Sequence, residues 1–232
     1  MKKLGIIGAM AVEVEELKSQ MTDLAVKERA GMEFFEGKLE GLPAVVVVCG
    51  VGKVNAALCV QILCDLFGVT HIVNTGVAGS LCAELDIGDF VIGREATHHD
   101  FDCSYLGYAV GQVPGLAVKS FPADEELVAA AYAAAEKTYA GHSRIGGIAS
   151  GDQFVSSKAV KERIIENTGA LCTEMEGAAI AQAAWRNNIP FVVIRAISDK
   201  ADDSAQMDYP TFEAAAAKRS AAVTRELARQ LL

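Results

Sequence analysis

Short apolar runs rich in β-branched residues recur along the chain, separated by segments of a different periodicity. The runs cover residues 4–7, 44–48, 71–74, 90–92, 145–148 and 191–197. Their length and their content of Val and Ile predict strands. Because several of them are continuously apolar rather than alternating, we expect both faces of these strands to be buried, as in a parallel sheet covered by helices.

The segments between the strands have helical spacing. After the first strand, Met10, Val14, Leu17 and Met21 recur at the spacing that places them on one face of an amphipathic helix. Comparable patterns predict further helices over residues 54–67, 124–139, 156–167, 174–187 and 209–232. The last of these carries its arginines toward its end, where cations suit the helix dipole.

The alternation of strand and helix predicts the fold class. We expect one α/β domain over residues 1–232, with a mixed, mainly parallel central sheet flanked by helices. Residues 32–39 are interpreted as an added antiparallel strand that leads into the strand at 44. In such sheets ligands bind beyond the carboxyl ends of the strands, so candidate chemistry is sought there.

Charge and composition exclude several classes of partner. The formal net charge is −9 and no basic cluster offsets it, which disfavours nucleic acid. The longest strictly apolar runs, such as 44–49, are far below the ~20 residues of a membrane span. Six cysteines without C-x-x-C spacing are typical of reduced thiols, so we expect a cytoplasmic protein.

Glycine-rich turns follow several of the predicted strands, but they do not match the common nucleotide motifs. Gly50-Val51-Gly52 has Asn55 where the dinucleotide fingerprint needs its third glycine, and Gly52-Lys53 lacks the upstream glycine of a P-loop. No G-x-S-x-G nucleophile motif occurs. We therefore expect no bound cofactor.

The segment His98-His99-Asp100-Phe101-Asp102 is the one stretch that suggests a metal. Its spacing fits no common zinc or iron signature, so a polar loop is the favoured interpretation and no metal is expected.

Acidic residues near the strand ends are the main candidates for chemistry. Glu13 borders the core-facing stripe of the first helix, although an acidic residue in a first turn also complements the dipole. That dipole role suffices for Glu174, whereas Glu176 precedes small apolar residues and is harder to explain. Asp199 ends a buried strand, where desolvation favours the protonated form unless Arg195 or a backbone donor offsets it. A carboxyl group in that state is a candidate general acid, and the alternative is a helix cap.

Six motifs, taken together and in order, resemble the 5′-methylthioadenosine/S-adenosylhomocysteine nucleosidases within the nucleoside phosphorylase fold. They cover nearly the whole chain: residues 5–10 with Glu13 close behind, 50–57, 74–79, 151–154, 174–176 and 195–202. The resemblance implies an N-glycosidase that releases adenine from 5′-thio-substituted adenosines, in methionine salvage and the methyl cycle. Each motif alone is weak evidence, and the six in register are strong evidence.

The resemblance also implies a role for each catalytic candidate. Asp199 would protonate N7 of adenine or form a hydrogen bond to it, and Ser198 would help to orient the carboxylate. Glu176 would hold the ribose hydroxyls and favour the oxocarbenium-like sugar. Glu13 would position and deprotonate the attacking water.

Further positions are implied as substrate contacts. Phe154 would stack on adenine, with Val155 reading its edge through the backbone. The other implied contacts are Met10 and Met175 at the sugar, Val51 and Tyr209 at the 5′-thio group, and Val77, Ala78, Gly79 and Arg195 within the matching motifs. Leu106 and Pro114 match positions that a partner subunit contributes to the 5′ pocket, so the resemblance implies a homodimer.

Val77 departs from the family pattern, which often has Ser at this position. In the phosphorylase relatives a hydroxyl there helps to bind phosphate, so Val favours water as the nucleophile. Three alternatives stay open: an aminodeoxyfutalosine nucleosidase, a purine nucleoside phosphorylase, and a catalytically silent nucleoside-binding protein on the same fold. The sequence leaves the preferred 5′ substituent open.

Overall fold

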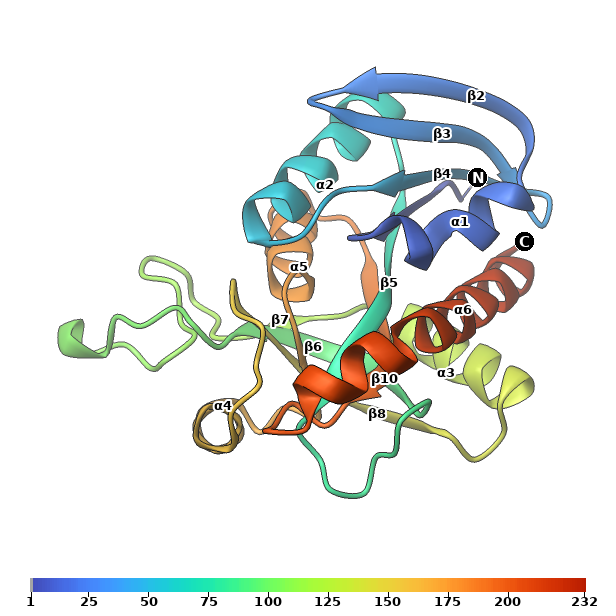
Figure 1. Cartoon of the computed structure of the whole chain (residues 1–232). Coiled ribbons are helices and arrows are strands. Elements are labelled where there is room, and N and C mark those ends of the chain that lie inside the picture. Colours follow the sequence, from blue (N-terminus) through green and yellow to red (C-terminus); the bar gives the residue numbers. More distant parts are fainter. Residues whose placement is uncertain (1) are drawn as a thin grey trace.

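The computed structural model describes residues 2–232 as ten strands and six α-helices in one α/β domain (Figure 1). The strands are β1 (Leu4–Gly8), β2 (Thr22–Arg29), β3 (Met32–Leu39), β4 (Leu42–Val48), β5 (His71–Ser80), β6 (Phe90–His98), β7 (Phe121–Pro122), β8 (Ser143–Ser150), β9 (Cys172–Glu174) and β10 (Phe191–Asp199). The helices are α1 (Ala11–Ser19), α2 (Lys53–Phe67), α3 (Glu125–Thr138), α4 (Lys158–Thr168), α5 (Gly177–Arg186) and α6 (Ala205–Leu231), with a short 3₁₀-helix at Ser104–Leu106.

All ten strands belong to one mixed sheet. Parallel pairings join β1 to β4 and β5, β5 to β10, and β8 to β6 and β9. Antiparallel pairings add β2 and β3 at one side and join β10 to β6 and β5 to β9. Because β5 pairs with both β9 and β10, strands β5, β10, β6, β8 and β9 form a closed ring of pairings.

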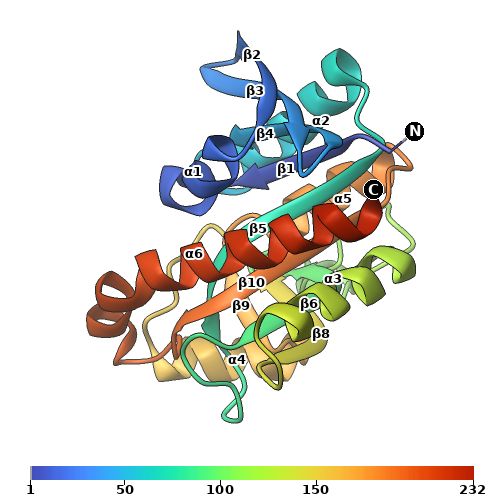
Figure 2. The same ribbon diagram turned by 90° about the vertical axis from the view of Figure 1, so that its right-hand side faces the viewer.

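Successive residues of the central strands point to opposite faces, and both faces are buried. Ile7 and Val193 pack with α2 and α5 in one core cluster, whereas Ile6 and Val192 pack with α1, α3 and α6 in the other. Figure 2 shows α6 running along β5 and β10, with α1 and α3 beside it. The continuously apolar runs of the sequence therefore mark strands covered on both faces, as predicted.

The predicted elements are confirmed, and the elements missing from the prediction have weak sequence signals. Every residue of β2 is exposed, because this strand pairs only with β3 at the edge of the sheet, and its polar sequence shows no buried face. Strand β9 has three residues, too few for a periodic pattern. It takes up Glu174, so the helix expected from residue 174 begins at Gly177.

A buried network of hydroxyl groups fastens α6 to β5. The Oγ atoms of Thr75 and Ser220 lie 2.8 Å apart, and the Thr224 hydroxyl donates to Thr75 at 2.9 Å. Ser220 also accepts the N–H of Gly76 at 3.2 Å. Because unpaired buried polar groups cost free energy, this network fixes the strand immediately before Val77.

Among residues 2–232, none of the helices combines the length and the apolar character that a membrane crossing requires.

Candidate active site

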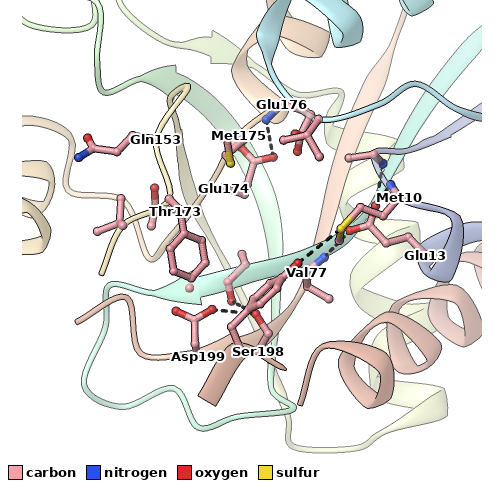
Figure 3. Close-up of a pocket in the computed structure, with 17 residues that line it drawn as sticks. Met10, Glu13, Val77, Gln153, Thr173, Glu174, Met175, Glu176, Ser198 and Asp199 are labelled. Carbon is pink, nitrogen blue, oxygen red and sulfur yellow. Dashed lines mark hydrogen bonds between the residues drawn. The ribbon is translucent and has the colours of Figure 1, made fainter. Parts of the chain in front are cut away.

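A cavity opens at the carboxyl ends of the parallel strands, where the fold class predicts a ligand (Figure 3). The cavity and its open mouth together enclose about 580 Å³ of empty space. The lining residues come from both halves of the chain: Ala9, Met10, Glu13, Val51, Val77, Ala78, Gly79, Gln153, Phe154, Val155, Thr173, Glu174, Met175, Glu176, Ser198, Asp199 and Tyr209.

This lining contains every site residue expected from the sequence except Arg195, Leu106 and Pro114. Arg195 is fully buried and forms ion pairs with two of the lining carboxylates. Leu106 is 68% exposed and lies in the 3₁₀-helix at the tip of the green segment that projects at the left of Figure 1. Pro114 follows in the same connection between β6 and β7.

Glu13 is held on three sides by backbone amides. Its Oε2 accepts the N–H groups of Ala9 at 2.7 Å and Met10 at 3.0 Å, and its Oε1 accepts the N–H of Val77 at 3.1 Å. The side chain is buried, and this burial raises its pKa, although Arg195 and the three amides act in the opposite direction. Both expectations hold for Glu13, since it belongs to the first helical turn and also points at the strand ends.

Gly76 is sterically required beside Glu13. A Cβ atom at this position would overlap Nη1 of Arg195 and Oε1 of Glu13. The glycine that follows the third predicted strand therefore lets the side chains of Glu13 and Arg195 approach the backbone closely.

Glu174 and Glu176 differ in how they are satisfied. Glu174 accepts the Ser150 hydroxyl, the N–H of Gly177 at 2.8 Å and a short charged bond from Nη2 of Arg195. It therefore does complement the start of α5, as the sequence indicated. Glu176 accepts the N–H of Gly52 at 2.8 Å and lies 3.6 Å from Arg195.

Burial and the neighbouring Glu174 raise the pKa of Glu176 to about 7, although Arg195 partly offsets them. Two carboxylates thus share one buried cation, and Glu176 keeps spare acceptor capacity toward the cavity.

Asp199 ends β10 in a buried position. Its Oδ1 accepts the N–H of Ala201 at 2.8 Å and its Oδ2 accepts the Ser198 hydroxyl at 2.9 Å. Burial nevertheless raises the pKa of Asp199. The opposing donors are the backbone of Ala201 and the Ser198 hydroxyl, while the contacts of Arg195 go to Glu174, Glu176 and Asn74.

An aromatic pair closes another part of the cavity. The rings of Phe154 and Tyr209 meet edge to face with their centroids 5.4 Å apart. Phe154 is 45% exposed, which leaves ring surface free for a planar ligand.

A polar clasp, which the sequence did not reveal, joins the start of α2 to the segments that follow β6 and β8. Lys53 Nζ donates to Asp100 at 2.6 Å and Lys53 N–H donates to Asp152 at 2.9 Å, while Asp152 N–H donates to Asp100 at 2.9 Å. These partners are 47 to 99 residues apart, so no local pattern connects them.

In residues 2–232 no group of three metal-ligating side chains occurs.

The chain is similar in sequence to known proteins over almost its whole length. The family model of the phosphorylase superfamily matches residues 3–229, so the chain belongs to this superfamily. A 5′-methylthioadenosine/S-adenosylhomocysteine nucleosidase of Geobacillus thermodenitrificans is 44% identical over 94% of the chain and 93% of its own length.

Solved structures agree with this relationship. The nucleosidase of the same name from Neisseria meningitidis, solved with methylthio-immucillin-A, superposes with a TM-score of 0.96 at 38% identity, covering 99% of this chain and all of its own. A futalosine hydrolase of Helicobacter pylori superposes at 0.94 with 32% identity, covering 99% and 98%. Within the superfamily, the chain belongs to the 5′-methylthioadenosine/S-adenosylhomocysteine nucleosidases.

The raised pKa of Glu176 predicts a pH-dependent stability. Between the ordinary value of 4.5 and the folded value of about 7, the folded protein binds more protons than the unfolded chain. The free energy of unfolding should therefore fall as pH rises through this window. In Glu176→Gln this fall should be smaller, as measured by urea unfolding at pH 5 and pH 8. Glu15→Gln, at an exposed position, is the control. The same pH dependence in Glu176→Gln as in the wild type would contradict the raised pKa of Glu176.

Proposed function

We propose that residues 1–232 form one nucleosidase domain that hydrolyses the N-glycosidic bond of 5′-methylthioadenosine and S-adenosylhomocysteine. The products are adenine and the 5-substituted ribose. The observation that carries the proposal is the meeting of Glu13, Glu176 and Asp199 in one buried cavity, in a chain of this family. A catalytically silent protein on this fold would need none of the three, and all are present.

Asp199 acts as the general acid. Burial favours its protonated form, and the Ser198 hydroxyl holds one of its oxygens in place. It transfers a proton to N7 of adenine, so that the electron pair of the breaking bond between C1′ and N9 neutralises the resulting positive charge and adenine leaves as a neutral molecule. Phe154 offers its exposed ring face to the adenine.

Glu176 stabilises the sugar. Its carboxylate has one backbone donor, from Gly52, and accepts hydrogen bonds from the ribose hydroxyls with its remaining lone pairs. As positive charge develops on the sugar, the ionised form of Glu176 becomes more favourable, because opposite charges attract strongly in a buried site.

Glu13 binds the nucleophilic water. The water oxygen forms the new bond to C1′, and its proton passes to the carboxylate of Glu13. Phosphate is disfavoured as the nucleophile because the lining includes four carboxyl groups and no lysine or arginine. Arg195 is already paired with Glu174, and the Val77 N–H is used by Glu13.

The molecule works as a homodimer in the cytoplasm in this proposal. Val54 is 79% exposed on α2, and Tyr105 and Leu106 are 100% and 68% exposed on the projecting segment. Apolar surface of this kind favours association, and the resemblance places Leu106 and Pro114 at the 5′ pocket of the partner. The cytoplasmic location rests on the six cysteines, which form no disulfide among residues 2–232 and stay reduced in such a compartment.

Replacing Asp199 tests the acid. Asp199→Asn keeps the size of the side chain but removes the proton, so we expect adenine release to slow by about 10²–10⁴-fold while nucleoside binding persists. Adenine is measured by chromatography, with methylthioadenosine, S-adenosylhomocysteine, 5′-deoxyadenosine and aminodeoxyfutalosine as substrates. A near-wild-type rate would rule out this role, and cleavage of the futalosine derivative alone would favour the futalosine hydrolase activity.

The identity of the nucleophile is tested in phosphate-free buffer. We expect the same rate with and without phosphate, a free 5-substituted ribose as product, and near-complete loss of hydrolysis in Glu13→Gln. Formation of a ribose 1-phosphate that depends on added phosphate would replace the hydrolase with a phosphorylase.

The dimer is tested by sedimentation. The wild type should sediment as a dimer, and Leu106→Asp should shift the equilibrium toward monomer, because burying a charge at an apolar contact is costly. A wild-type monomer at micromolar concentration would contradict the proposed assembly.

A further inference from the structure

Tyr209 and Glu213 on α6 form a hydrogen-bonded pair that takes no part in the reaction described above. The Tyr209 hydroxyl donates to Oε1 of Glu213 at 2.9 Å, and the same hydroxyl lies 3.4 Å from Sδ of Met10. Tyr209 lines the cavity and Glu213 lies behind it, partly buried. Within residues 2–232, no lysine, arginine or histidine nitrogen lies within 4.0 Å of the Glu213 carboxylate.

The absence of a cation beside Glu213 leaves its charge uncompensated. A partly buried carboxylate is normally paired with a cation, whereas among residues 2–232 the one hydrogen-bond partner of the Glu213 carboxylate is the neutral phenol of Tyr209. Nearby Asp208, at the start of the same helix, also has a neutral partner, because it accepts the Ser204 hydroxyl at 2.6 Å. Glu213 thus attracts positive charge to the Tyr209 end of the cavity.

The phenol transmits this charge to the cavity. Burial and the neighbouring Glu213 raise the pKa of Tyr209, so the phenol keeps its proton and donates it to the carboxylate. Its oxygen still has lone pairs that can accept a hydrogen bond. Donation to an anion makes that oxygen a stronger acceptor, because the members of a hydrogen-bonded chain polarise one another.

Several apolar side chains line the cavity with Tyr209, and the charges of Glu13 and Asp199 also act on its phenol. Met10, Val51 and Val77 line the cavity with it, and Val51 is 48% exposed, which places it toward the mouth. This inference rests on the proposed function, in which Glu176 binds the ribose, and the family resemblance implies that Met10 lies beside this sugar. Its 5′ substituent therefore extends past Met10 toward the Tyr209 hydroxyl.

We propose that Tyr209 and Glu213 form a recognition pair for nucleosides whose 5′ substituent carries a protonated amine, such as the homocysteinyl group. The ammonium donates to the phenol oxygen, and the charge of Glu213 stabilises it from behind. A methylthio group has no donor and gains nothing from the pair. Glu213 is thus a specificity-determining residue that does not touch the reacting atoms.

The test uses three nucleosides that differ only in the 5′ substituent. They are 5′-methylthioadenosine, which is neutral there, 5′-(3-aminopropylthio)adenosine, which carries only the cation, and S-adenosylhomocysteine, which carries an amine and a carboxylate. In Glu213→Gln the amide oxygen still accepts the Tyr209 hydroxyl, so the ring stays in place and only the charge is lost. Glu15→Gln on α1 is the matched control, because it removes an exposed charge without touching Tyr209.

We expect Glu213→Gln to lower kcat/KM for the aminopropylthio nucleoside roughly tenfold, mainly through KM, as for one lost charge-assisted contact. Its effect on methylthioadenosine should stay within about twofold, and S-adenosylhomocysteine should fall between the two. Tyr209→Phe should remove the same preference, and adding Glu213→Gln to it should lower the preference no further, because the charge acts through the phenol.

Equal losses for all three nucleosides would overturn the proposal and reduce Glu213 to a support for the Tyr209 ring. Wild-type kcat/KM values for all three nucleosides in Glu213→Gln would also overturn it, because the pair would then not recognise the 5′ substituent. Failure of the proposed function is a different result, namely no adenine release from any nucleoside by the wild type. In that event, calorimetric affinities of the three nucleosides for the wild type and Glu213→Gln test the pair directly.

Discussion

The ion pair between Arg195 and Glu174 is the constraint on which the cavity depends. Arg195 stands on β10, Glu174 ends β9, and Asn74 on β5 accepts from the same guanidinium at 2.6 Å. One buried cation thus links three strands and lies beneath a cluster of carboxylates. Removing it would leave Glu174 and Glu176 buried without a counter-charge, and breaking such a pair costs about 3–5 kcal/mol.

The same excess of carboxylates over cations gives the site its chemistry. Burial raises the pKa values of Glu13, Glu176 and Asp199, but the three groups have different partners. Glu13 receives three amide donors and lies near Arg195, which favours the ionised state of a base. Among residues 2–232 no lysine, arginine or histidine forms an ion pair with Asp199, and burial favours its acid form. Environments that separate acid from base in this way let similar side chains take opposite roles.

Helix α6 connects the stability of the fold to the choice of substrate. Through Ser220 and Thr224 it is fixed to β5 beside Gly76, and this strand supplies the amide that holds Glu13. Through Tyr209 and Glu213 its first turns form the wall that faces the proposed 5′ substituent. The residues that anchor α6, Ser220 and Thr224, are therefore separated along the helix from Tyr209 and Glu213, which face the proposed 5′ substituent.

The sequence alone determined the fold class and most of the cavity, because both depend on local patterns. Continuous apolar runs identify strands such as β10, and residues at the ends of such strands, Asp199 among them, must meet at one edge of a parallel sheet. The family resemblance supplied the expected roles of Glu13 and Glu176, which lie together in the cavity as anticipated.

Only the tertiary structure decided which polar groups pair across long distances. Three features follow from how the elements pack. They are the ion pair of Arg195 with Glu174, the clasp of Lys53 with Asp100 and Asp152, and the exposure of strand β2. A local pattern records which face of an element is buried. It carries no information on which distant donor meets which acceptor, because that is fixed by the relative placement of the strands and helices.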